Sequence, residues 1–443
     1  MKKSILILAL LFAIAIAVPL SAAETAGDDP LTLEQALEIA FQNSPQIKLA
    51  YDQVEKSRGG VREARANLLP KFDTEITHTR QGPTVSFGGQ SIVRDHDTSA
   101  SASVFVPVDV SKQFAHVTGI SKYQYETDRL GLLAAQQQLI LDVKTAYLDV
   151  LRARGGLEVA QAAYDAAQAR LKNTQIKFEV GDVAKFDVTR DSVEVANLEQ
   201  GLLAAKNGVR TATSAFNRVL GIDVSAPTHI ADIDIPVSDS PVEMEESIVR
   251  ALENRPEIQQ AHIGIQAGEK NVKLTRTEIR PSADITGAYN YAYRASGFSS
   301  QKDSWVAFLT FRVPIWDGGV TKAKVDQAHA DLQAAKDGLM EAELGVALEV
   351  RVAALDMQES AERVDTAKQN LALAEEAARL ANVRRDAGVS ILVEVIDAES
   401  ALTEARFNYV NARYDYAVAK AQYEKAVAAQ PEMETMQLVG AGS

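Results

Sequence analysis

The apolar positions along this chain repeat with two different periods, and the helical period gives way to a strand period at two places. Directly after Pro70, and again after Pro281, apolar and polar residues alternate with a period of two, which is typical of β-strands. In the first of these stretches a Gly-rich loop at 81–97 separates the two strands. The pattern therefore predicts one β-hairpin at residues 71–108 and a second at residues 282–315.

The period is helical over unusually long distances elsewhere. Residues 111–177 and 318–384 contain no proline and are rich in alanine, leucine, glutamate and glutamine. Each span predicts a helix of roughly 100 Å, far longer than the helices of globular domains. A short segment with one glycine, Gly181 or Gly388, follows each span and predicts a turn.

After each turn the helical pattern resumes, at residues 186–220 and 393–427. The small alanine side chains in these segments allow neighbouring helices to approach closely, so we expect packing of the coiled-coil type. The predicted fold class is mostly α with β: long helical hairpins combined with short antiparallel strands.

The same order of elements is present in both halves of the chain. Asn43 and Pro45 recur as Asn254 and Pro256, each 211 residues further on. A tandem repeat of this length predicts two structural repeats. We place them at residues 24–220 and 242–430, joined by a linker rich in proline, aspartate and serine at 221–241, and we expect residues 431–443 to be a disordered tail.

The amino terminus predicts export from the cytoplasm. Lys2 and Lys3 precede an apolar run, and small residues at 21–23 suit signal peptidase, so residues 1–23 are interpreted as a signal peptide. No later stretch is long and apolar enough for a transmembrane helix. If the exported protein crosses a membrane, it must therefore do so with strands.

Composition narrows the function classes. The chain has no cysteine and a formal charge of −14, which excludes disulfides and thiol chemistry and argues against nucleic acid as a partner. The six histidines lack ligand spacing, and no phosphate-binding loop or nucleophile motif is present. We therefore expect no enzyme activity, no metal and no cofactor.

The number of strands has a consequence for assembly. Four strands cannot close a barrel, and an open edge in lipid leaves backbone groups unpaired at a cost of several kcal/mol each. Three chains with four strands each would give 12, an even number in the range of known membrane barrels. If the hairpins lie in a membrane, several chains must therefore pool them; the alternative is a soluble periplasmic coiled-coil adaptor or scaffold protein.

Three segments carry a resemblance to a known family. The chain resembles the TolC-type outer-membrane efflux proteins at residues 31–45 (LTLEQALEIAFQNSP), 66–70 (ANLLP) and 313–319 (VPIWDGG). The resemblance implies a homotrimer in the outer membrane: a 12-stranded β-barrel continued by a helical coiled-coil barrel across the periplasm. It also implies a passive exit duct that docks with an inner-membrane pump and a periplasmic adaptor.

The resemblance further implies where a pore gate would lie. The turns at Gly181 and Gly388 would form the periplasmic tip of the tunnel, and Asp187, Glu394 and Asp397 match positions where the family places acids at the pore constriction. Acids in the first turn of a helix are also favoured by its dipole alone. Arg385 is the candidate gate latch, through an acid such as Asp187, although a cation at a helix end has the same electrostatic explanation.

Overall fold

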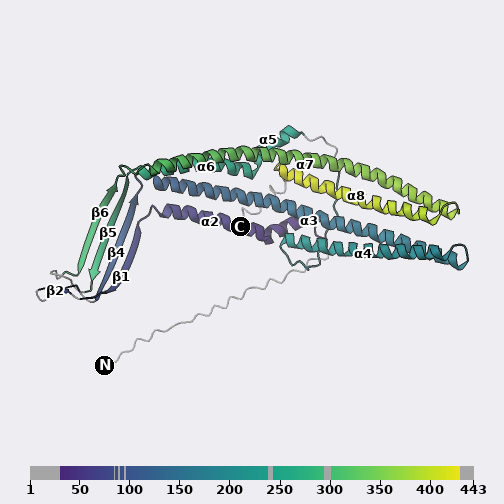
Figure 1. Cartoon of the computed structure of the whole chain (residues 1–443), viewed down its shortest axis with the longest axis horizontal. Helices are drawn as coiled ribbons and strands as arrows, with labels where there is room; N and C mark the ends of the chain where they lie inside the picture. The colour runs from purple at the N-terminus through teal and green to yellow at the C-terminus, as the bar shows by residue number, and fades with distance from the viewer. Residues whose placement is uncertain are drawn as a thin grey trace, which may run out of the picture.

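The computed structural model describes residues 30–83, 85–87, 90–93, 96–237, 243–293 and 301–429. The predicted signal peptide, the predicted tail at 431–443, residues 238–241 of the predicted linker and residue 242 of the predicted second repeat lie outside the described residues. Figure 1 shows an elongated molecule with a β-sheet at one end and a long helical rod that extends from it.

Four antiparallel strands form the sheet, in the order β1-β4-β5-β6. The strands are β1 (Lys71–Arg80), β4 (His96–Val108), β5 (Ser282–Ala292) and β6 (Asp303–Arg312). β1 pairs with β4 and β5 pairs with β6, which confirms both predicted hairpins. The pairing of β4 with β5 then joins the two hairpins into one sheet, and β1 and β6 form its edges.

The loop expected at 81–97 contains structure that the sequence pattern did not predict. β2 (Val85–Phe87) and β3 (Gln90–Val93) pair as a separate two-stranded sheet, with an irregular register after Val85. Valine, isoleucine and phenylalanine favour extended backbone, and here this preference is stronger than the turn signal of the surrounding glycines.

The register gives the sheet two chemically different faces, because residues paired directly across strands lie on the same face. One face is apolar and carries Phe72, Ile76, Val104, Val106, Ile285, Tyr289, Tyr291, Trp305, Leu309 and Phe311. The other face is mostly polar and carries Asp73, Glu75, Thr77, Ser99, Ser101, Ser103, Asp284, Asn290, Ser304 and Thr310. Phe72 and Ile76 are each 79% exposed, so the described part of one chain leaves this region of the apolar face uncovered.

The helical rod continues directly from the strands. α2 (Pro45–Ala66), α3 (Gln113–Glu179), α6 (Pro256–Thr275) and α7 (Val320–Asp386) lie side by side in one layer, in that order, with the short 3-10 helix η1 (Arg276–Ile279) between α6 and β5. α4 (Lys185–Leu220) returns along α3, and α8 (Leu392–Ala426) returns along α7. Among the described residues, no helix has the length and apolarity to cross a membrane.

The two long helices confirm the predicted lengths. α3 and α7 each have 67 residues, and their ends are displaced by two residues from the predicted spans. Both helices run without a break through the glycines they contain. Gly155 of α3 instead allows close approach, because a Cβ atom there would lie 2.9 Å from Cγ1 of Val410 on α8.

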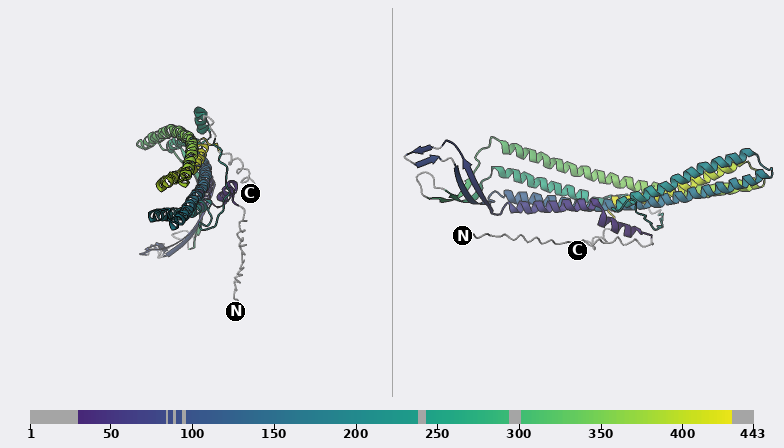
Figure 2. Two further views of the ribbon diagram at one scale, coloured as in Figure 1. Left: turned by 90° about the vertical axis from the view of Figure 1, so that its right-hand side faces the viewer. Right: turned by 90° about the horizontal axis from the view of Figure 1, so that it is seen from below.

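Buried apolar residues form a core at the middle of the rod. α1 (Leu33–Asn43) starts with a capping box formed by Thr32 and Gln35, and α5 (Met244–Asn254) is its counterpart in the second half. Leu37 of α1 is buried with Val143 and Tyr147 of α3. In the end-on view of Figure 2, α1 and α5 lie on the convex side of the curved helical layer.

Tyr147 anchors the segment before α1 and the linker to this core. Its hydroxyl oxygen lies 2.6 Å from the carbonyl oxygen of Ala231 and 3.0 Å from that of Leu31, and its single proton forms a bifurcated hydrogen bond to both. Burial raises the pKa of Tyr147 to about 12, so the hydroxyl stays protonated and remains a donor at physiological pH. Tyr147 therefore holds the segment before α1 and the linker against the middle of the rod.

Candidate gate at the free end of the rod

Both helical turns lie at the end of the rod that is opposite to the sheet (Figure 1). Gly181 has φ +86° and Gly388 has φ +75°, a left-handed backbone conformation that favours glycine. In each turn the glycine N–H and the next N–H donate back to the last helical turn, at 3.0 and 2.8 Å after α3 and at 3.0 and 2.9 Å after α7. These are Schellman motifs, and they explain why each long helix ends where a glycine follows.

The three candidate acids lie next to these turns. Asp187 is half-buried in the first turn of α4, and Glu394 and Asp397 are exposed in the first turns of α8. Glu394 accepts a hydrogen bond from Ser390 Oγ at 2.6 Å and lies 4.0 Å from Nη2 of Arg384. Within the part of the chain that the structure describes, the side chains of Asp187 and Asp397 have no hydrogen-bond or ion-pair partner.

Arg385 connects the two helical hairpins close to the tip. Its Nη2 atom donates a hydrogen bond of 3.1 Å to Oγ1 of Thr174, which is fully buried on α3. Within one chain, Arg385 therefore bonds to a hydroxyl of the helical hairpin formed by α3 and α4. The proposed pairing of Arg385 with Asp187 stays a prediction.

A buried ion network lies further up the rod, and the sequence analysis did not identify it. Arg170 of α3 is 7% exposed, and its Nε atom lies 2.9 Å from Oδ1 of Asp191 on α4, which is fully buried. Nη1 of Arg170 contacts the carboxylate of Glu399 on α8. Asn382 of α7 also donates to Glu399, at 3.5 Å. The network thus joins all four helices of the two hairpins.

The position of Arg170 explains what this network can do. Arg170 precedes Gly181 by 11 residues, which places it about 16 Å from the tip along α3. A buried cation that two carboxylates hold from different helices resists separation of those helices, because separation leaves charges unpaired in a poorly solvated site. The network therefore opposes movement of α7 and α8 away from α3 and α4.

In the sequence, Arg170, Asp191 and Glu399 look like ordinary charged residues on the exposed surface of a helix. Their contact depends on how the hairpins pack, and no local pattern contains that information. The described residues contain no group of three or more histidines, aspartates and glutamates suited to hold a metal ion.

Comparisons with known proteins match this architecture. The family model described as "Outer membrane efflux protein" matches residues 36–222 and 247–429. The outer membrane protein TolC of Vibrio cholerae is 26% identical over 406 residues, which cover 90% of each chain. TolC of Escherichia coli is 23% identical over 428 residues, which cover 92% of this chain and 84% of the relative.

A solved structure shares the fold. The chain superposes on the crystal structure of the Campylobacter jejuni CmeC outer membrane channel with a TM-score of 0.77 and 18% identity. The superposition covers 92% of this chain and 88% of the other chain. This likeness shows that the two chains share one fold.

We expect the substitution Arg170→Met to lower the melting temperature of the purified protein clearly. The change leaves Asp191 buried without its cation, and loss of one partner of a buried pair costs about 3–5 kcal/mol. Arg379→Met is the matched control, since Arg379 is a 60% exposed cation of α7 that pairs only locally with Glu376. The control should have the same melting temperature as the unmodified protein. Equal melting temperatures for the two variants would contradict a stabilising role for Arg170.

Proposed function

The chain belongs to the outer membrane efflux protein family, and we propose that three copies of it assemble into one exit duct across the outer membrane. The protein is located in the outer membrane, and its helical part lies in the periplasm. The observation that carries the proposal is the four-stranded sheet with one apolar face and two open edges.

The edges of the sheet require neighbours. β1 and β6 each have one row of backbone groups without a strand partner inside the chain. In hydrocarbon these groups cost several kcal/mol each unless another strand pairs with them. Pairing of β6 of one chain with β1 of the next satisfies both edges, and repetition of the contact closes a barrel.

The requirement for a bore favours three chains. Two chains with four strands each would give eight strands, and side chains fill the interior of a barrel of that size. Three chains give 12 strands and a wider, water-filled interior. The polar face of the sheet, with Glu75, Ser101, Asn290 and Ser304 in one row across the four strands, supplies the lining of that bore.

The apolar face argues against the alternative function as a soluble adaptor or scaffold. Trp305 is 77% exposed and Leu309 is 68% exposed, on the same face as Phe72 and Ile76. A contiguous exposed apolar face of this kind would cause a soluble periplasmic protein to aggregate. Contact with lipid provides the cover that one chain lacks.

The duct is passive in this proposal, and partner proteins supply the energy and direction of transport. The partners are a periplasmic adaptor and an inner-membrane pump that meet the free end of the rod. Val180, Phe186 and Val389 are exposed next to the two turns, and apolar residues at the end of a hydrophilic rod are suited to contact with other proteins.

The gate lies at the same end. Assembly around a threefold axis multiplies Asp187, Glu394 and Asp397 into rings of carboxylates at the constriction, and such rings favour cations. The bond between Arg385 and Thr174 and the network around Arg170 keep α7 and α8 close to α3 and α4. The tip then stays narrow until a partner moves these helices.

Single substitutions on each face of β1 test the assembly. Ile76→Arg places a charge on the lipid face near the middle of the strand, which costs about 2–4 kcal/mol. We expect a strong decrease of trimer recovered from the outer-membrane fraction after crosslinking. The adjacent control Thr77→Arg changes the polar face and should still assemble; equal recovery of the two variants would rule out this orientation of the sheet.

Removal of the Arg385 side chain tests the latch. A hydrogen bond from a charged donor is worth about 1.5–3 kcal/mol, so Arg385→Ala should increase the population of open channels about tenfold or more. Single-channel recordings in planar bilayers measure this population. Arg379→Ala removes the same charge from an exposed position of α7 that pairs locally with Glu376, and it should change this population far less. Unchanged recordings for Arg385→Ala would mean that Arg385 does not hold the gate.

A further inference from the structure

Three cations from three different helices meet in a groove near the sheet end of the rod. Arg65 comes from the last turn of α2, Lys122 from α3 and Lys270 from α6. The groove has a volume of about 420 Å³. Gly119 forms part of its floor, and the side chain of Lys270 lies across it, since a Cβ atom at Gly119 would be 3.6 Å from Cε of Lys270.

The groove is on the outer side of the helical layer. Lys122 precedes Val143 by three heptads, and Gly119 precedes Ile140 by three heptads. A straight helix turns by only about 20° per heptad relative to a seven-residue repeat, so each pair lies within about 60° of the same direction. Val143 and Ile140 are buried in the core cluster that contains α1, and α1 lies on the convex side of the layer (Figure 2).

The groove also lies close to the sheet, where the helices of the rod join the strands. Arg65 is six residues before β1, and Lys122 is about 14 Å along α3 from the start of that helix. Helical side chains tilt toward the N-terminus of their helix, which for α3 is the end at the sheet. Trp316, which is 85% exposed, occurs at the same junction, and tryptophan is typical of membrane interfaces.

The cations of the groove have no acidic partner among the described residues. Within the described residues, none of Arg65, Lys122 and Lys270 forms an ion pair, although the whole chain has a formal charge of −14. The hydroxyl of Thr118, which also lines the groove, is buried and has no hydrogen-bond partner among the described residues. The three cations are therefore available to an anionic ligand.

His116 reports the same electrostatic environment. Burial lowers the pKa of His116, and the nearby cations Lys270, Arg280 and Lys273 lower it further, with Asp109 as a weaker opposing charge. The cations of α6 and of the segment before β5 therefore extend the positive surface around the groove.

We propose that this groove binds the phosphate-bearing headgroup of an anionic phospholipid from the periplasmic leaflet of the outer membrane. The inference rests on the proposed function, because that function places the sheet in the membrane and the rod below it. Cations close to a membrane surface attract anionic lipids, and lysine and arginine side chains donate charge-assisted hydrogen bonds to phosphate oxygens. α2, α3 and α6 of one chain form the whole groove, so a trimer has three equivalent sites.

Native mass spectrometry of the purified full-length assembly tests the site. Phosphatidylglycerol and phosphatidylcholine with identical acyl chains are titrated separately, and the bound lipids are counted on the protein peaks. We expect up to three phosphatidylglycerol molecules per trimer, bound about tenfold more tightly than phosphatidylcholine. The variant Arg65→Gln/Lys122→Gln/Lys270→Gln should lose this preference.

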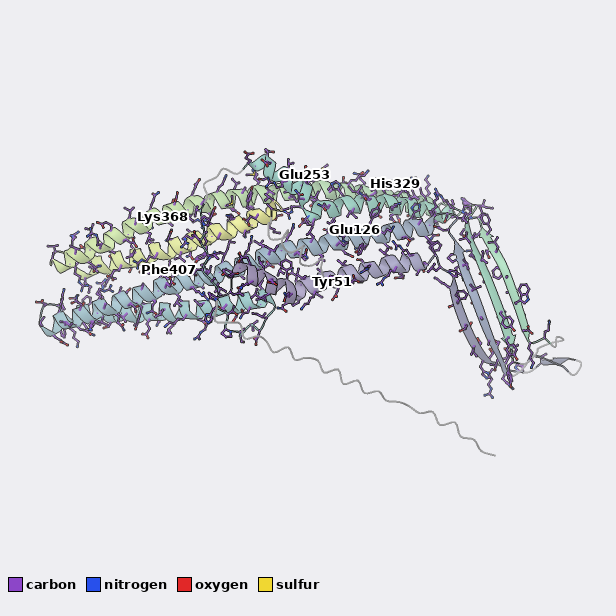
Figure 3. The ribbon with its side chains drawn as sticks, turned by 180° about the vertical axis from the view of Figure 1, so that it is seen from behind. Tyr51, Glu126, Glu253, His329, Lys368 and Phe407 are labelled. Atoms are coloured by element: carbon purple, nitrogen blue, oxygen red, sulfur yellow. The ribbon has the colours of Figure 1, made fainter. Side chains whose placement is uncertain are left out.

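A charge-matched control separates the site from net charge. Lys172→Gln/Lys206→Gln/Lys368→Gln removes three exposed cations from the rod and should keep the preference. Lys368, labelled in Figure 3, lies far from the sheet. Equal binding of the two lipids to the unmodified protein, or an unchanged preference in the groove variant, would overturn the proposal.

Two further results have distinct meanings. Displacement of phosphatidylglycerol by excess inorganic phosphate would identify a site for free phosphate and would overturn the lipid assignment. The bound lipids are counted on the peaks of every oligomeric species in the spectrum. Absence of a trimer peak would therefore count against the proposed assembly, whereas a trimer without lipid preference would count against this groove alone.

Discussion

The unpaired backbone edges of β1 and β6 are the constraint on which the rest of the structure depends. A sheet with an apolar face toward lipid needs a partner for every backbone N–H and C=O group at its edges, and the described part of one chain supplies four strands to this sheet. Closure with other copies satisfies the edges, places the polar face inward and creates a bore. The single-layer arrangement of α2, α3, α6 and α7 has the same order as the strands, so closure of the sheet also closes the rod into a tunnel.

The tunnel must be stiff along its length and movable at its tip, and the distribution of contacts along α3 and α8 meets both needs. Lys144 pairs with Glu424 and Arg152 with Asp415 near the middle of the rod, where the core around Tyr147 fixes the helices. Toward the tip this core ends, and the network around Arg170 and the single bond from Arg385 to Thr174 join the two hairpins. A partner that acts on the tip therefore has few interactions to break.

Local sequence patterns determined most of the fold correctly. The absence of proline predicted both 67-residue helices, and Gly181 and Gly388 marked turns whose backbone has positive φ. The strands β2 and β3 were missed because the glycines around them indicated a loop. Arg170 and the cationic groove were missed for a different reason: their residues come from separate helices, and only the packing of those helices brings them together.

A disulfide scan between neighbouring chains tests the closure of the sheet most directly, because the protein has no native cysteine. One cysteine replaces Thr74 in β1, and a second replaces Trp305, Ala307 or Leu309 in β6 in successive variants. β1 and β6 lie at opposite edges of one sheet, so a bond between them must join different chains. The account predicts covalent products in outer membranes that stop at three chains. Products that stop at two chains, or monomers alone for every variant, would contradict it.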